Sequence, residues 1–130
     1  MTFDTNAQVL HWWVSAEEEM EFVEYALRWR RSRQSMFHAH LALELALKAA
    51  VCKAISDTPP KVHDLVKLAG QASLPTSEEQ RGFLGEMNKF NISGRYTDPF
   101  PSEPPHEQAV ILVESAKEFV EWLKSQLFKV

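Results

Sequence analysis

The sequence predicts an all-α protein, an up-and-down helical bundle of about five helices in which the third helix is short. The main observation is the stretch 37–56, where fourteen of twenty residues are apolar or alanine. Apolar residues recur at helical spacing in the stretches before and after it, and the sequence lacks the alternation of a half-buried strand. We therefore expect residues 1–130 to form a single helical domain.

The first helix is predicted over residues 6–32. Asp4, Thr5 and Asn6 offer side-chain oxygens that can cap its N-terminus. The apolar residues behind them follow a 4-3-4-3-4 spacing: Val9, Trp13, Ala16, Met20, Val23 and Leu27. Ser32 and Ser35 are expected to end this helix and to cap the next one, so that the two helices form an antiparallel hairpin.

The stretch 37–56 is expected to form a long, mostly buried helix at the centre of the bundle. Leucine, valine and isoleucine recur every fourth residue on one side, and alanines follow a 3-4-3 spacing on another. Such a helix needs neighbours on several faces. It should therefore be packed between the other helices.

Three further helices are predicted after the prolines at 59–60. Residues 61–69 indicate the short third helix, which ends at Gly70. Thr76 and Glu79 have the spacing of a capping box for a fourth helix, which ends near Asn91. The proline-rich stretch 92–105 is expected to be a long ordered loop, and the last helix follows it with a wide apolar face.

Composition limits the classes of function. The net charge of −4 argues against a general electrostatic attraction to nucleic acid. The single cysteine, Cys52, excludes a disulfide framework and favours a reducing compartment, so we expect a cytoplasmic protein without a membrane span. The motifs for a metal site, a nucleotide-binding loop or a serine nucleophile are missing, and no cofactor is expected.

A line of polar residues interrupts the apolar central stretch. His40, Glu44 and Lys48 lie one turn apart, and the order of Glu44 and Lys48 suits an ion pair. If the pair is buried, it needs further partners, and His40, His63, Arg95 and Asp98 are the candidates. The pair is either part of a binding site or a structural ion pair.

Two other clusters admit both a functional and a structural interpretation. Arg95, Tyr96 and Asp98 could recognise a phosphate or a base, or they could close the end of the bundle. Four arginines, Arg28, Arg30, Arg31 and Arg33, lie near the predicted end of the first helix. They could stabilise that helix end, or they could form a patch that binds phosphate or a partner.

Three short motifs together resemble the HEPN domain family, small prokaryotic helical bundles often encoded beside a minimal nucleotidyltransferase. The resemblance covers nearly the whole chain. It rests on the segment FHAHLALELALKAAV at 37–51, on His63-Asp64-Leu65, and on Arg95-Tyr96-Thr97-Asp98. Leu41, Leu45 and Thr97 depart from the residues usual in the family.

The resemblance implies a non-catalytic module that binds a nucleotide, a nucleotidyltransferase partner, or both, and that could belong to a toxin–antitoxin pair. Glu44 and Lys48 match the acid and base of the family's central helix, and Arg95, Tyr96 and Asp98 match its loop motif. The candidate ligand-binding residues are therefore Arg95, Tyr96, Asp98, Glu44, Lys48 and His63. The chain is expected to form a homodimer, because its helices offer more apolar surface than one bundle can bury.

Two alternatives accompany this expectation. Some HEPN proteins are metal-independent ribonucleases that use an arginine and a histidine separated by four to six residues. Arg95 has no histidine at that spacing, whereas Arg33 and His38 are separated by four residues at the junction of the first two helices. The chain could therefore be an RNA-cleaving toxin, or it could be a structural dimer without a ligand.

Overall fold

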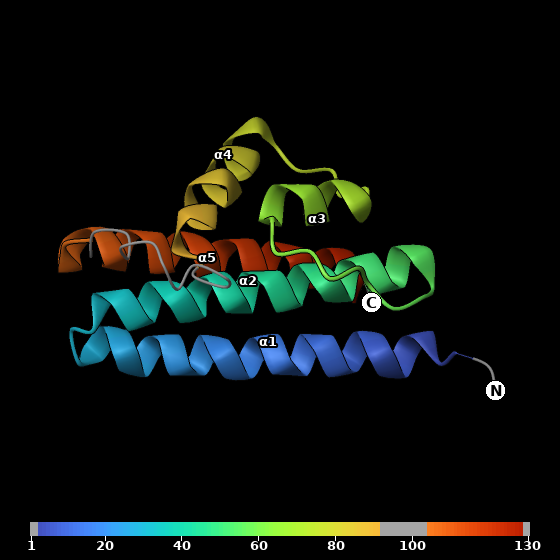
Figure 1. The fold of residues 1–130 in the computed structure, drawn as a ribbon, viewed down its shortest axis with the longest axis horizontal. Helices are drawn as coiled ribbons and strands as arrows, with labels where there is room; N and C mark the ends of the chain where they lie inside the picture. Colours follow the sequence, from blue (N-terminus) through green and yellow to red (C-terminus); the bar gives the residue numbers. More distant parts are fainter. Residues whose placement is uncertain (1–2, 92–103, 129–130) are drawn as a thin grey trace.

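The computed structural model describes residues 3–91 and 104–128, and these form an all-α bundle (Figure 1). The described residues contain five α-helices and one short 3₁₀ helix. Their bounds are α1 Thr5–Arg28, α2 Ser32–Ile55, α3 Leu65–Gln71, α4 Glu78–Met87, η1 Asn88–Phe90 and α5 His106–Leu127. The predicted fold class, with its short third helix, is confirmed.

The helices α1 and α2 form the antiparallel hairpin that the sequence predicts. Asp4 caps α1, because its side-chain oxygen accepts a hydrogen bond from the backbone N–H of Ala7 at 3.1 Å. The prediction that α1 extends to residue 32 was wrong. The helix ends at Arg28, and Arg30 adopts a positive φ of 58° in the turn.

The expected caps of α2 were also wrong. Arg31 is the N-cap residue and makes no side-chain capping bond. Ser32 and Ser35 lie inside the helix and are buried, so they are part of its packed surface rather than its boundary. The helix starts five residues before the predicted stretch, directly after the turn.

The helix α2 is the centre of the bundle, as predicted. It contacts α1, α5, α3 and η1, and Figure 1 shows it between α1 and the other helices. Apart from the exposed Ala54, its alanines are almost fully buried, which permits close approach of its neighbours. Four large apolar residues of the helix are completely or almost completely buried: Met36, Leu43, Leu47 and Val51.

The short helices α3 and α4 lie on the side of α2 away from α1 (Figure 1). The residue Asp64 caps α3 by accepting hydrogen bonds from the backbone N–H groups of Val66 and Lys67. The predicted capping box of α4 is present one residue later than expected, with Ser77 and Gln80 in place of Thr76 and Glu79. Asn91 follows η1, close to the predicted end.

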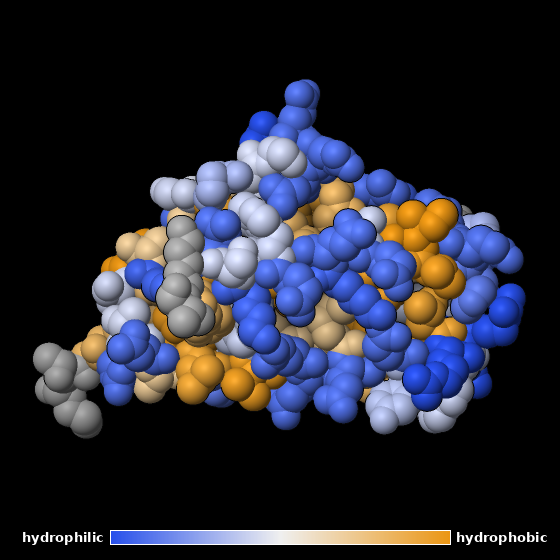
Figure 2. All heavy atoms as spheres, turned by 180° about the vertical axis from the view of Figure 1, so that it is seen from behind, coloured by the Kyte–Doolittle hydropathy of each residue, from blue (hydrophilic) through white to orange (hydrophobic). Residues whose placement is uncertain are grey.

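The last helix, α5, completes the core with its apolar face. Its buried residues are Ala109, Leu112, Val113, Ala116, Phe119, Val120, Leu123 and Leu127. They pack mainly toward α2 and also toward α1. Figure 2 shows the face of the molecule that is hidden in Figure 1; hydrophilic atoms cover much of it, and hydrophobic atoms gather toward its two ends. No helix in the described part of the chain is long and apolar enough to cross a membrane.

Candidate functional site

A buried carboxylate, Glu44, is the centre of the candidate site. It lies on the middle of α2 with 6% of its surface exposed. Its Oε2 atom is 3.1 Å from the Lys48 ammonium nitrogen and 2.9 Å from Nδ1 of His63. Both contacts are within hydrogen-bond distance of one carboxylate oxygen. The structure thus brings together the predicted residues Glu44, Lys48 and His63.

The ammonium group of Lys48 has two neighbours. Its nitrogen is paired with Glu44 and lies 5.8 Å from the centre of the Trp12 ring of α1. This distance is within the range of a cation–π interaction. Only 8% of the surface of Lys48 is exposed, so its charge depends on these neighbours for compensation.

His40 lies one turn before Glu44 and is 2% exposed. Its Nδ1 is 3.8 Å from Oε1 of Glu44, which is too far for a hydrogen bond. Burial lowers the pKa of His40, although the Glu44 carboxylate, the side chain of Asn88 and the backbone of His63 oppose this effect. Among the described residues, its Nε2 has no hydrogen-bond partner.

The start of α3 fixes the position of His63. Asp64, the next residue, is the N-cap of α3 and also accepts a hydrogen bond from Nδ2 of Asn88 at 2.9 Å. Oδ1 of Asn88 accepts a bond from the backbone N–H of Leu65, also at 2.9 Å. Burial alone would raise the pKa of Asp64, but the hydrogen bonds from Lys67, Asn88 and Val66 outweigh it and lower the pKa.

Of the described residues Glu44, Lys48, His40 and His63, His63 is the most exposed. The side chain of His63 is 47% exposed, while that of Glu44 is 8% exposed. Among the described residues, His63 therefore marks the most accessible approach to the buried carboxylate for a ligand or partner. A carboxylate, an ammonium and two imidazoles can bind polar or charged groups and can transfer protons. No three His, Cys, Asp or Glu residues of the described chain are placed to hold a metal ion.

The predicted loop residues Arg95, Tyr96 and Asp98 lie outside the described residues. Their expected contacts with Glu44 and Lys48 therefore stay a prediction. The same holds for the long ordered loop expected over 92–105, apart from its last two residues.

The residues of the ribonuclease alternative both lie on α2. His38 Nδ1 is 2.8 Å from Oε1 of Glu19 on α1, and its ring lies against Phe22 with 4.2 Å between the ring centres. Arg33 is exposed one and a half turns earlier. Residues five apart on a helix point about 140° away from each other, so the two side chains do not share a face within one chain.

Sequence reasoning missed two residues of the polar cluster. No motif in the neighbouring sequence marks Asn88. Its role depends on the packing of η1 against the start of α3. Trp12 follows the apolar pattern of α1 only loosely, and nothing in the local sequence links it to Lys48. Both links are tertiary contacts between segments far apart in the chain.

The fold and the site define the class of the protein: a small helical bundle in which the buried Glu44 and Lys48 form an ionic cluster with His63. The family model for the HEPN domain matches residues 9–126. The chain therefore belongs to the HEPN domain family, as its motifs indicated.

A solved structure supports the same assignment of the fold. The crystal structure of an archaeal HEPN homologue is similar to this chain with a TM-score of 0.72 and 18% sequence identity. The similarity covers 93% of this chain and 98% of the archaeal one. No curated protein sequence matches the chain.

Proposed function

We propose that the chain is a non-catalytic HEPN module that binds a nucleotide, a nucleotidyltransferase protein, or both. The observation that carries this proposal is the burial of Glu44 and Lys48 in contact with each other and with His63. In this proposal the module is a homodimer and acts within a toxin–antitoxin pair. HEPN family members often dimerise.

The energetics of buried charges support a binding role. Removing two charges from water costs several kcal/mol per ion, and an apolar pair of similar volume is often equally stable or more stable. The bundle has more than enough apolar residues on α2 to fill this position with leucine or methionine. A buried ion pair beside a half-exposed histidine is therefore better explained by recognition than by stability alone.

Each residue of the proposed site has a distinct role. Arg95 contacts a phosphate through its planar guanidinium group, and Tyr96 stacks on a base. In this proposal Glu44 and Lys48 fix the loop that carries Arg95 and Tyr96 through charged hydrogen bonds. His63 and Asp98 are further candidate ligand-binding residues. The roles of the loop residues are carried over from the resemblance of Arg95-Tyr96-Thr97-Asp98 to the family motif.

A ligand screen tests the proposal. Ribonucleoside mono-, di- and triphosphates are added singly to the full chain, and at least one should raise the melting temperature because it binds only the folded state. Arg95→Ala should abolish the shift while the bundle stays folded, and Arg81→Ala, an exposed arginine of α4, should preserve it. Absence of any shift, together with no nucleotidyltransferase that co-purifies with the chain, would refute the proposal.

The second candidate is a metal-independent ribonuclease, and the contact of His38 with Glu19 favours it. A carboxylate that holds Nδ1 of a histidine leaves Nε2 free to transfer a proton, as general acid–base catalysis requires. Single-stranded RNA should then be cut in the presence of a chelator, and His38→Ala should stop the reaction while His11→Ala does not. Cleavage that persists in the His38 variant rules out this site.

A further inference from the structure

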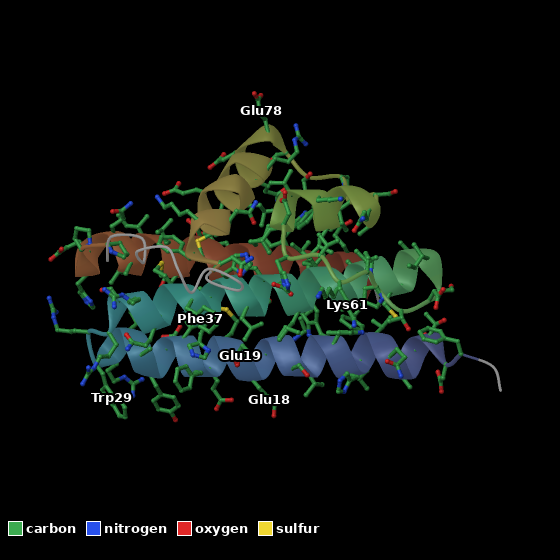
Figure 3. The ribbon with its side chains drawn as sticks, viewed as in Figure 1. Glu18, Glu19, Trp29, Phe37, Lys61 and Glu78 are labelled. Atoms are coloured by element: carbon green, nitrogen blue, oxygen red, sulfur yellow. The ribbon has the colours of Figure 1, made fainter. Side chains whose placement is uncertain are left out.

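The helix α1 exposes an apolar stripe on the side opposite to the core. Residues 10, 14, 18, 21, 25 and 29 follow a 4-4-3-4-4 spacing, which keeps them on one face. Four of these six are large apolar residues, and they are 54%, 44%, 50% and 71% exposed: Leu10, Val14, Tyr25 and Trp29. In Figure 3, Glu18 and Trp29 both point away from α2.

The second half of this stripe is aromatic. Phe22 lies beside it with 47% of its surface exposed, so Phe22, Tyr25 and Trp29 form one exposed aromatic patch over the last two turns. The guanidinium carbon of Arg28 is 5.7 Å from the centre of the Tyr25 ring. Tyrosine, tryptophan and arginine are the residues that most often dominate the energy of protein interfaces.

Charges of opposite sign are separated along α1 and the turn that follows it. Glu17, Glu18 and Glu21 precede the aromatic patch, Arg28 lies within it, and Arg30 and Arg31 follow it in the turn after α1. All six are exposed. The patch therefore lies between an acidic segment and a basic segment of the same chain.

We propose that a second copy of this chain docks on the aromatic patch, with its α1 antiparallel to the first and the two-fold axis at Tyr25. This proposal rests on the homodimer of the proposed function and identifies the surface that forms it. A two-fold contact pairs a surface with itself, so the two halves of that surface must be complementary to each other. Here the acidic half of one copy would face the basic half of the other.

The register follows from the charges. With the two-fold axis at Tyr25, Phe22 of one copy lies opposite Arg28 of the other. Glu21 of the first copy lies opposite Trp29 of the second. Glu18 then lies opposite the turn that carries Arg31. An axis near residue 19 would bring the acidic segments of both copies together, and a parallel arrangement would match like charges along the whole helix.

The same argument favours a second copy over an unrelated partner. An acidic or basic partner would match only one of the two segments and would meet repulsion at the other. Only a partner with the reverse order of charges around an aromatic centre satisfies both, and the antiparallel copy has that order. The exposed aromatic rings would bury each other at the centre, where interface residues contribute most.

Sedimentation velocity of the full chain over a concentration series tests the proposal. The wild type should dimerise, and Trp29→Ala should raise the dimer dissociation constant by at least about tenfold, as expected for an interface hot spot. Ile111→Ala is the matched control, because Ile111 is an equally apolar residue on α5 with 64% of its surface exposed. It should leave the dissociation constant unchanged.

A charge-reversal pair makes the test specific for the register. The double variant Glu18→Arg/Glu21→Arg and the double variant Arg28→Glu/Arg31→Glu should each be monomeric, and an equimolar mixture should form a heterodimer. Circular dichroism verifies that both variants are folded. A wild-type monomer, or a dimer that Trp29→Ala and both charge variants leave intact, overturns the proposal. Nucleotide binding by such a protein would still support the binding role in the proposed function, so the failure of the dimer surface and the failure of the binding role are distinguishable.

Discussion

At the scale of single residues, Glu44 is the position where a small change should have the largest effect. Glu44→Gln keeps the shape of the side chain but leaves the buried Lys48 ammonium without its counter-charge. Because a broken buried pair typically costs about 3–5 kcal/mol, we expect a loss of a few kcal/mol in the free energy of unfolding. Denaturant unfolding monitored by circular dichroism measures the change.

The control for Glu44 is an exposed ion pair with the same residue types. Glu114, 63% exposed at the side chain, lies 3.7 Å from Lys117 on α5. Glu114→Gln should cost no more than about 0.5 kcal/mol, because solvent screens exposed pairs. Equal effects of the two substitutions would show that Glu44 is not a buried charge centre in solution.

His40 predicts a dependence of stability on pH. Its pKa is lowered in the folded protein because the ring is buried, so between that pKa and the unfolded value of about 6.5 the unfolded chain binds more protons. The free energy of unfolding should therefore fall as the pH drops below about 6.5, until the pH passes the folded pKa. His40→Gln should flatten this part of the profile, and His11→Gln, at an exposed position, should leave it unchanged.

The residues of the site were partly predictable from the sequence. A polar line on an apolar helix indicated Glu44 and Lys48, because buried charges need partners and apolar surroundings make burial probable. His40 and His63 were among the predicted partners, and both lie next to Glu44. Asn88 and Trp12 were not predictable, because only the packing of η1 and α1 brings them to the cluster.

At the scale of elements, the capping box of α4 gives a sharp prediction. Ser77 Oγ accepts from the backbone N–H of Gln80 at 3.0 Å, and the Gln80 side chain accepts from the N–H of Ser77 at 2.8 Å. Ser77→Ala should cost about 1 kcal/mol in the free energy of unfolding. Thermal and denaturant unfolding of the variant measure the loss.

The comparison with Thr76 separates the observed cap from the one that the sequence suggested. Thr76 lies one residue before the N-cap, and Gln80 is three residues after Ser77. Thr76→Ala should therefore cost less than Ser77→Ala, although it also removes a 3.3 Å contact with Arg81. A larger loss at Thr76 would contradict the assignment of the cap.

Helix existence and type were predictable, whereas several boundaries were not. Periodicity located all five helices because each has to bury one apolar face. The end of α1 depends on the conformation of Arg30, and arginine does not favour positive φ. The turn results from the tertiary packing of α1 against α2. The local residue preferences therefore did not predict where α1 ends. Ser32 and Ser35 were misassigned as caps for the same reason.

At the scale of the whole molecule, the bundle combines a stable apolar scaffold with one ionic cluster. The scaffold comprises α1, α2 and α5, which bury large apolar surfaces against one another. The cluster lies where α2 meets the start of α3, and η1 fixes that junction through Asn88. This separation means that the charges can be replaced without removing the main core.

The central claim is that the buried Glu44–Lys48 pair serves nucleotide binding and is not simply a stabilising ion pair. Calorimetric titration with the nucleotide identified in the thermal screen tests it on the double variant Glu44→Gln/Lys48→Met. We expect this variant to regain much of the stability lost in Glu44→Gln, because both charges are gone, and to bind the nucleotide at least about a hundredfold more weakly. Affinity equal to that of the wild type in the folded double variant would contradict the claim.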